Sequence, residues 1–272
     1  MTIIEAIILG IVEGVTEFLP VSSTGHMILA SYFMGIQDDA YTKLFEICIQ
    51  LGAILSVVVV YWKKFFVFKS WQFYVKLFIA VIPALILGFL FNDAIEALLE
   101  SPLTVSITLI LGGIVLLFID KAFKNPAVNE EPGITMKNAF VIGLWQCISM
   151  IPGVSRSAAT IIGGMQQKLT RNLAAEFSFF LAVPTMAAAT GYSLILKKWQ
   201  VNGVEMKGYE LLTQNEGDLI TFGVGALVSF IVAMIAIKSF ITFLQKHGFR
   251  LFGIYRIIAG LVMLLVLGWR YF

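Results

Sequence analysis

Charged residues are scarce in this sequence. Only 13% of its 272 residues are Asp, Glu, Lys or Arg, whereas 59% are hydrophobic and the mean hydropathy is +0.90. Soluble proteins carry about 25% charged residues, so the composition excludes an ordinary soluble domain and indicates an integral membrane protein. The formal net charge of +2 leaves no basic surplus for a phosphate backbone, and we therefore expect no nucleic-acid partner.

Cysteine is also rare, and a nucleotide-binding motif is missing. Cys48 and Cys147 lie in apolar stretches without metal-ligand spacing around them, which excludes a disulfide framework and a zinc site. No GxxxxGK[ST] motif occurs, so ATP is not an expected ligand. Residues 1–15 lack the basic start of a signal peptide and carry Glu5 and Glu13, so we expect them to remain part of the fold.

Long apolar runs, in contrast, are abundant, and a helix needs about 20 apolar residues to cross a bilayer. Six runs approach this length, centred on residues 44–62, 75–91, 103–120, 174–196, 218–238 and 251–269. Two further apolar regions, 2–36 and 138–166, are interrupted by polar sequences at Pro20 and Pro152. A break open to lipid leaves backbone groups unpaired, so we predict that each region forms a re-entrant helical hairpin. The expected fold is an all-α integral membrane domain.

The two interrupted regions resemble each other. GIVEGVTEFLPVSST (10–24) and GLWQCISMIPGVSRS (143–157) share a glycine, then Glu or Gln, a proline and a serine-rich turn. Residues 110–119 are likewise echoed at 257–266. A hairpin followed by three spans crosses the membrane an odd number of times, so the second repeat must have inverted topology. We predict a single transmembrane domain over 1–272, with repeats over about 1–121 and 135–272.

The loop charges predict the orientation. Segments 62–76 and 238–250 contain basic residues and no acid, whereas 92–102 contains acids and no Lys or Arg. Because positively charged loops stay in the cytoplasm, the first two segments are expected inside, and 92–102 and 197–218 outside. Both termini are then outside. The basic residues of 62–76 are Lys63, Lys64, Lys69 and Lys76, and the acids of 92–102 are Asp93, Glu96 and Glu100.

The first interruption is rich in acids and hydroxyls. Glu13 and Glu17 are four residues apart, so they share one face of a helix. Two carboxylates in a low-dielectric site need a metal cation or a guanidinium beside them, unless they are interfacial and wetted by headgroups. Three hydroxyl residues follow where the next helix begins: Ser22, Ser23 and Thr24. They are either ordinary N-caps or part of a phosphate site at a helix N-terminus.

A histidine and an arginine complete the candidate set. His26 lies just inside the second helix, where it can act as a general acid or base or as a nucleophile, or be structural. In the second interruption, Arg156 stands between Ser155 and Ser157, and Thr160 follows one turn later. A guanidinium fork binds phosphoryl oxygens in pairs, although an arginine reaching to the interface is the alternative. Together the two turns predict a phosphate site suited to phosphoryl transfer.

The two interruptions read EGVTE (13–17) with PVSSTGH (20–26), and PGVSRSAAT (152–160). These sequences resemble the signature motifs of the undecaprenyl-diphosphatase family, also called bacitracin-resistance proteins. FEICIQLGAILSVV (45–58) is similar to the family's stretch between the motifs, so the resemblance covers nearly the whole chain. It implies a bacterial membrane phosphatase that removes the terminal phosphate of undecaprenyl diphosphate. The product is the monophosphate carrier lipid of cell-wall synthesis.

The resemblance also implies roles for individual positions. The family's motif residues fall on Glu13, Glu17, Ser23, His26, Ser155, Arg156, Ser157 and Thr160. Members need a divalent cation, which implies magnesium, or calcium as the alternative, held by Glu13 and Glu17. They form homodimers in the bacterial plasma (inner) membrane, among its lipids, and open their active site to the periplasmic or extracellular face.

The nucleophile remains open at this stage. Ser23 is the first choice, with His26 as its proton partner; a phosphohistidine at His26 and a water activated by Glu17 are the alternatives. Gln50 and, one turn earlier, Glu46 either complete the pocket or make hydrogen bonds between helices. The competing function is a transporter or flippase of a polyprenyl phosphate or another anion, because inverted repeats and broken helices also serve alternating access. The paired acids beside a nucleophile favour the enzyme.

Overall fold

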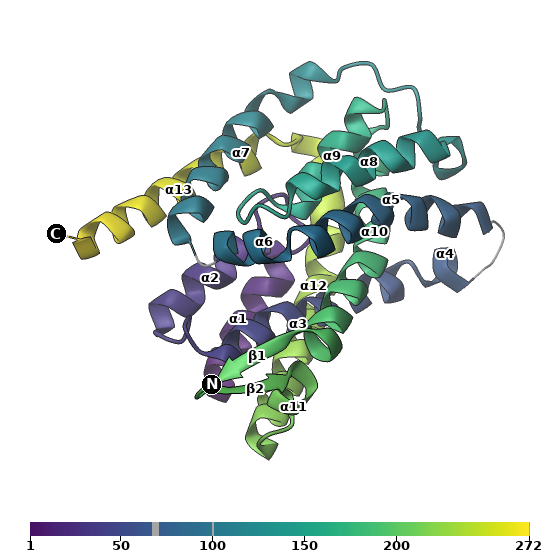
Figure 1. Ribbon diagram of the computed structural model, residues 1–272. Coiled ribbons are helices and arrows are strands. Elements are labelled where there is room, and N and C mark those ends of the chain that lie inside the picture. Colours follow the sequence, from purple (N-terminus) through teal and green to yellow (C-terminus); the bar gives the residue numbers. More distant parts are fainter. Residues whose placement is uncertain (67–70, 100, 272) are drawn as a thin grey trace.

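Helices dominate the structure (Figure 1). The computed structural model describes residues 1–66, 71–99 and 101–271, apart from the side chains of 96, 99 and 268–271. The first half contains α1 (Ile3–Thr16), α2 (Ser23–Met34), α3 (Ala40–Val60), α4 (Trp62–Phe66), α5 (Trp71–Leu90), α6 (Asn92–Leu99) and α7 (Pro102–Ala122). The second half contains η1 (Glu131–Gly133), α8 (Met136–Ile148), α9 (Arg156–Gln166), α10 (Arg171–Gly191), the π-helix η2 (Tyr192–Leu196), β1 (Lys198–Val201), β2 (Val204–Lys207), α11 (Gly208–Leu212), α12 (Glu216–His247) and α13 (Arg250–Tyr271).

Within the described residues, six helical segments are long and apolar enough to cross a membrane, in agreement with the six spans predicted from the sequence. They are Ala40–Val60, Trp71–Leu90, Pro102–Ala122, Arg171–Leu196, Glu216–His247 and Arg250–Leu267. Large apolar side chains on these helices face outward, for example Phe89, Leu111 and Leu265, as expected where lipid is the solvent. The protein is therefore a mostly helical, multi-pass membrane protein.

The two interrupted regions each form a pair of short helices joined by a turn, as predicted: α1 with α2, and α8 with α9. The first helix of each pair starts with a capping box, made by Thr2 with Glu5 in α1 and by Thr135 with Asn138 in α8. The four helices have 14, 12, 13 and 11 residues, and a helix of that length is too short to cross a bilayer.

The first helix of each pair packs against a span from the other half of the chain: α1 lies along α12, and α8 lies along α5. Glycines permit the close approach. A Cβ on Gly14 would lie 2.7 Å from the Ser229 carbonyl oxygen, and one on Gly143 would lie 2.3 Å from the Ala80 carbonyl oxygen. At the centre α3 packs on α10, while α7 and α13 run side by side along one flank (Figure 1).

A β-hairpin is the one correction to the all-α prediction. Lys198–Val201 and Val204–Lys207, within the predicted outer segment 197–218, pair as antiparallel strands. Asn202 and Gly203 between them have φ of +52° and +82°. Two successive positive φ values are what a two-residue hairpin turn requires, and Asn-Gly adopts them readily. The turn preference of Asn202 and Gly203 explains the hairpin, which the pattern of apolar residues did not indicate.

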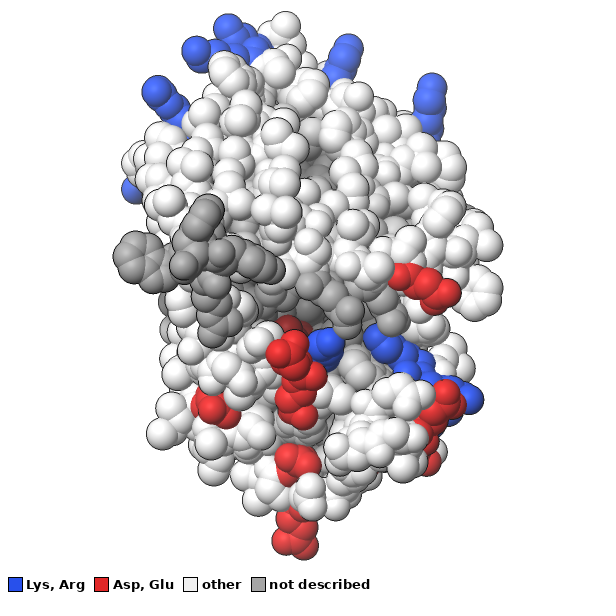
Figure 2. Space-filling model, turned by 60° about the vertical axis from the view of Figure 1, so that its left-hand side comes forward, with Lys and Arg blue, Asp and Glu red and all other residues white. Residues whose placement is uncertain are grey.

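Charged side chains gather toward the ends of the molecule. Figure 2 shows Lys and Arg without acids at one end of this face, and Asp and Glu together with some Lys or Arg toward the other, with little charge between them. Among the charges used for the orientation, Lys69 and Glu100 lie outside the described residues, as does the side chain of Glu96. In the described part of the chain, the buried charged residues are Glu13, Glu17, Lys76 and Arg256. The two glutamates mark the candidate site.

Candidate active site

Two turns of the same backbone conformation bring the candidate residues together. Ser22 has φ +74° and Ser155 has φ +77°, values that residues with a side chain rarely adopt. Each serine is the N-cap of the following helix: Ser22 Oγ accepts from the Gly25 N–H at 3.3 Å, and Ser155 Oγ accepts from the Ala158 N–H at 3.2 Å. Both serines thus have the capping role considered as an alternative. Both also line the cavity described below.

A buried ion pair joins the two turns. Arg156 Nη2 donates to Glu17 Oε1 at 2.6 Å, and both side chains are less than a tenth exposed. Arg156 Nη1 donates to the Ser178 carbonyl oxygen of α10 at 2.9 Å, which fixes the guanidinium. Its Nε has no hydrogen-bond partner among the described residues. A buried guanidinium with an unused N–H is suited to bind a phosphoryl oxygen.

The second oxygen of Glu17 accepts a hydrogen bond from Ser23. The Ser23 Oγ to Glu17 Oε2 distance is 2.6 Å, and both residues are buried. A carboxylate in direct contact with a hydroxyl is placed to take its proton during nucleophilic attack. The structure therefore puts Glu17 in the position that the sequence assigned to His26.

His26 uses both ring nitrogens away from Ser23. Nδ1 bonds the Ser22 carbonyl oxygen and Nε2 bonds the Tyr255 hydroxyl, each at 2.7 Å. The two rings are stacked, with centroids 5.6 Å apart. His26 is not among the described residues that line the cavity. Its catalytic role stays a prediction, and its contacts in this structure support the first turn.

Glu13 lies one turn before Glu17 on α1 and is fully buried. Neither of its carboxylate oxygens has a hydrogen-bond partner in the described part of the chain, and Oε1 of Glu46 on α3 is in the same state. A buried carboxylate without partners needs a proton or a cation. No group of three or more His, Cys, Asp or Glu side chains that could hold a metal occurs among the described residues. The residues that could hold a cation are therefore the pair Glu13 and Glu17.

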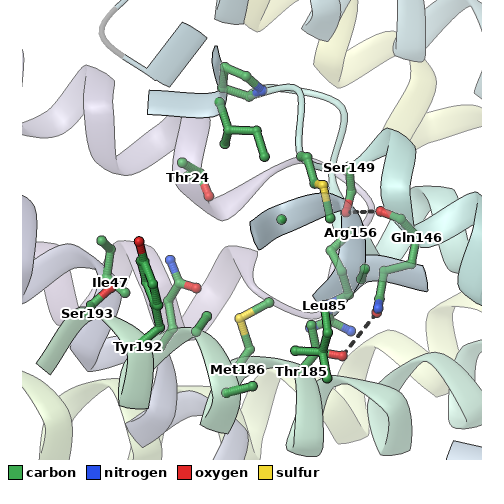
Figure 3. A pocket seen from close by; sticks show the side chains of 18 of the residues that line it. Thr24, Ile47, Leu85, Gln146, Ser149, Arg156, Thr185, Met186, Tyr192 and Ser193 are labelled. Carbon is green, nitrogen blue, oxygen red and sulfur yellow. Dashed lines mark hydrogen bonds between the residues drawn. The ribbon is translucent and has the colours of Figure 1, made fainter. Parts of the chain in front are cut away.

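A cavity of about 580 Å³ opens beside these groups. Polar groups from the two turns and from α3 line it: Glu17, Ser22, Ser23, Thr24, Gln50, Ser155 and Arg156. The lining residues from α5 and α10 are largely apolar: Ala84, Leu85, Phe89, Met186, Ala188 and Ala189. Figure 3 shows Arg156 on the same side as Gln146, with Thr24 and Tyr192 across the cavity. The cavity thus combines polar groups of both turns with apolar walls, as an amphipathic ligand requires.

Two predicted binding residues lie behind this cavity. Ser157 Oγ donates to the Phe18 carbonyl oxygen at 2.8 Å, so it ties the second turn to the first. Thr160 Oγ1 lies 2.7 Å from Ser178 Oγ, beside the carbonyl that holds Arg156. Neither is among the lining residues in the described structure. Their predicted contact with a substrate remains untested, and their hydrogen bonds position Arg156.

Several polar groups of the site were missed at the sequence level. Thr185 Oγ1 donates to Gln146 Oε1 at 3.2 Å within the cavity wall, and Ser178 holds Arg156. Gln146 was visible as the counterpart of Glu13 in the comparison of the two interruptions. Arg256 had the plainest signal, because an arginine inside the apolar run 251–269 is costly unless protein groups surround it.

The fold and the site define a multi-pass helical membrane protein in which two capped turns bury a hydroxyl, a carboxylate and a guanidinium beside a cavity with apolar walls. Comparison with known families then identifies the group. Residues 6–262 match the family described as bacitracin resistance protein BacA, and the chain belongs to this family. The resemblance of the motifs is thereby confirmed.

Curated relatives match over almost their full length. A protein of Flavobacterium psychrophilum is 57% identical over 98% of this chain and 96% of its own. One of Bdellovibrio bacteriovorus is 51% identical over 98% of this chain and 97% of its own, and one of Aquifex aeolicus is 44% identical over 96% and 97%. All three are named undecaprenyl-diphosphatase.

Proposed function

We propose that this protein is an undecaprenyl-diphosphate phosphatase. It hydrolyses undecaprenyl diphosphate to undecaprenyl phosphate and inorganic phosphate, and so recycles the carrier lipid of bacterial cell-wall synthesis and confers bacitracin resistance. The observation that carries the proposal is the contact of Glu17 with both Ser23 and Arg156 in a cavity with apolar walls. The names of the relatives agree with it.

The diphosphate is bound by groups from both turns. Arg156 supplies its unused Nε–H and can turn its Nη2 from Glu17 toward a phosphoryl oxygen. Residues at the N-termini of α2 and α9 line the same cavity, and both helix ends favour negative charge there. The isoprenoid chain lies along the apolar wall from α5 and α10, where Leu85 and Met186 line the cavity.

The reaction then needs a nucleophile and a base. Ser23 Oγ attacks the terminal phosphorus while its proton passes to Glu17 Oε2, with which it already shares a hydrogen bond. The bond from that phosphorus to the bridging oxygen breaks, and undecaprenyl phosphate leaves with the bonding electrons and takes the proton from Glu17. A water next attacks the phosphoserine and gives one proton to the again ionised Glu17. The bond from phosphorus to Ser23 Oγ breaks, Glu17 returns the proton to Ser23 Oγ, and phosphate is released. Arg156 stabilises the charge on the transferred group.

A divalent cation, magnesium by the family resemblance, fits the acidic end of this site. The buried Glu13 carboxylate, whose oxygens have no partner among the described residues, and the neighbouring Glu17 would hold it. Two carboxylates leave most positions of a magnesium ion to water and to phosphate oxygens, which is the usual composition of such sites. When bound, the ion would neutralise charge on the phosphoryl oxygens.

We further propose that the two halves are inverted repeats, each with one re-entrant hairpin and three spans. The packing pattern supports this, because an exchange of the halves maps it onto itself. α1 pairs with α12 as α8 pairs with α5, while α3 with α10 and α7 with α13 are pairs of equivalent helices. The positive φ of Ser22 and of Ser155 adds the same correspondence at the turns.

For localisation we propose the bacterial plasma (inner) membrane, with both termini outside and the active site open to the periplasmic or extracellular face. The cavity is lined by Asn92 and Ile95 of α6 and by Lys197 next to β1. These residues belong to the two segments that the charge rule places outside. A homodimer is proposed from the family resemblance alone.

The test is phosphate release from undecaprenyl diphosphate by purified protein, with magnesium and with EDTA. We expect chelator-sensitive release by the wild type and a loss of about 10³-fold or more in Ser23→Ala and in Glu17→Gln. Ser106→Ala is a matched control, because this buried serine bonds the carbonyl of Pro102 within α7, away from the cavity. Its activity should stay within about twofold of wild type.

The outcomes separate enzyme from transporter. No phosphate release by folded wild-type protein on any polyprenyl diphosphate would overturn the phosphatase proposal and leave the transporter or flippase as the function. Release that is unchanged by EDTA would remove the cation from the proposal and leave the serine mechanism in place.

A further inference from the structure

Arg256 is a buried charge that the proposed reaction does not use. It lies on α13, more than two hundred residues after the first turn, and its side chain is fully buried. Among the described residues, no carboxylate lies within ion-pair distance of its guanidinium. A charge in the membrane interior without a counter-ion must be satisfied by other polar groups.

Those groups are backbone carbonyls, and they come from both turns of the site. Arg256 Nη1 donates to the Pro20 oxygen at 3.1 Å and to the Val154 oxygen at 2.9 Å. Its Nη2 donates to the Gly153 oxygen at 2.7 Å. Pro20 lies two residues before Ser22, and Val154 lies directly before Ser155. One guanidinium therefore contacts both turns immediately before their positive-φ serines.

The same side chain is anchored on α7. Nη2 also donates to the Thr108 oxygen at 3.2 Å, and Nε donates to the Leu109 oxygen at 3.4 Å. Thr108 Oγ1 in turn donates to the Pro152 oxygen of the second turn at 2.5 Å. A Cβ on Gly112 would lie 2.2 Å from Arg256 Nη2, so this glycine leaves the room that the guanidinium occupies.

We propose that Arg256 is a positioning residue, which fixes the two turns relative to each other so that Ser23 and Arg156 both reach Glu17. A planar guanidinium presents five N–H donors in a fixed fork, so it can bond two chain segments and α7 at once. A lysine in its place has one nitrogen and cannot hold the same set. The inference rests on the proposed function for its effect on catalysis, but the clamp itself is a property of the fold.

The clamp can be measured without any substrate. Hydrogen exchange of the detergent-solubilised protein is followed by mass spectrometry on peptides that cover residues 19–26 and 151–158. We expect exchange about tenfold faster in both peptides in Arg256→Lys and in Gly112→Ala, because each variant removes charge-assisted hydrogen bonds to both turns. Gly223→Ala is the matched control, since a Cβ there meets nothing within 4 Å, and it should leave both peptides unchanged.

Catalysis supplies the second readout. In both variants we expect kcat to fall at least about tenfold while KM changes less than about threefold, because the binding groups remain but are misaligned. In an Arg156→Lys background the second turn no longer presents the guanidinium fork, so adding Arg256→Lys should lower kcat less than about threefold further. Such a loss of additivity is expected of a residue that acts through another. If Arg256→Lys acted only by destabilising the protein, it would lower kcat by the same factor in both backgrounds.

Faster exchange in only one of the two turns, or in neither, would overturn the proposed clamp. If the wild-type protein releases phosphate, an unchanged kcat in Arg256→Lys and Gly112→Ala would overturn it as well. Gly112→Ala retains the arginine, so it carries the test if Arg256→Lys fails to fold. If wild-type protein releases no phosphate, the proposed function fails, and the exchange experiment still decides whether Arg256 holds the two turns.

Discussion

Glu17 divides its two oxygens between the turns: Oε1 accepts from Arg156 and Oε2 accepts from Ser23. The same carboxylate thus contacts the proposed anion-binding group and the proposed nucleophile. A phosphoryl group that draws Arg156 away frees Oε1 and leaves Oε2 on the hydroxyl. In the proposed mechanism, binding of the substrate therefore converts Glu17 from an ion-pair partner into a general base.

We expect substitution of His26 to lower phosphate release much less than substitution of Glu17. His26→Gln should keep phosphate release within about tenfold of wild type, because both nitrogens of His26 bond the Ser22 carbonyl and Tyr255 instead of Ser23. Tyr255→Phe removes the Nε2 contact and should behave alike. The measurement is initial-rate phosphate release under saturating substrate. A His26→Gln defect as deep as that of Ser23→Ala would favour the phosphohistidine alternative.

The sequence predicted the members of the site better than their contacts. Glu17, Ser23 and Arg156 are recognisable because acids, hydroxyls and an arginine are rare in apolar sequence and stand beside prolines. Which of Glu17 and His26 meets Ser23 depends on side-chain direction after a turn, and residue types alone do not encode it. Arg256 lies outside both motifs, so its contact with the two turns required the tertiary structure.

The helix pairs of the two halves depend on close backbone contact. α8 crosses α5 where Gly143 faces the carbonyl of Ala80, and α1 crosses α12 where Gly14 faces that of Ser229. The interrupted apolar pattern predicted such short helices, but it did not say which spans they would touch. Long-range packing of this kind follows from shape, which a local pattern does not contain.

We expect Gly143→Ala to destabilise the protein. Its Cβ would come within 2.3 Å of the Ala80 oxygen, so α8 must move away from α5. Overpacking of this kind costs about 2 kcal/mol of unfolding free energy, which thermal unfolding in detergent would show as a lower Tm. Gly223→Ala, on α12 with open space around it, should leave Tm unchanged or slightly raised. Equal Tm values for the two variants would contradict the close contact.

Across the whole molecule, the proposed orientation can be compared with the positions of the charged segments and of the cavity. Lys63, Lys64 and Lys246 lie in segments that the charge rule keeps inside, whereas Asn202 is the tip of the β-hairpin at the other end. The cavity is lined at that hairpin end by Lys197. In the proposed orientation, the substrate enters the cavity from the outer leaflet.

Thiol labelling tests this orientation. In a background with Cys48→Ala and Cys147→Ala, a membrane-impermeant maleimide added to intact cells should label Asn202→Cys and leave Lys246→Cys unlabelled. Both positions are exposed, so access to the aqueous phase alone decides the result. Lysis of the cells should make Lys246→Cys reactive, which controls for folding. The reverse labelling pattern would place the cavity mouth in the cytoplasm.

The apolar walls of the cavity predict an effect of chain length. A Cβ on Gly88 has only the end of Met150 nearby, at 3.7 Å, and both residues line the cavity. Gly88→Phe should therefore fill this space and raise KM for undecaprenyl diphosphate about tenfold, because apolar contact is lost. A one-unit isoprenyl diphosphate should be affected much less. Gly223→Phe, exposed on α12, is the control for a new phenylalanine in a span.

The pairing of α1 with α12 has a consequence for biosynthesis. Ribosomes release α1 first, with the buried Glu13 and the glycine face that later meets α12. Until α12 leaves the ribosome, the face of α1 that packs on α12 has no neighbour from that helix. A nascent chain that stops before residue 216 therefore contains Glu17, Ser23 and Arg156 but not the packing partner of α1. The complete packing around the candidate active site can therefore form only after the final fifth of the chain has been synthesised.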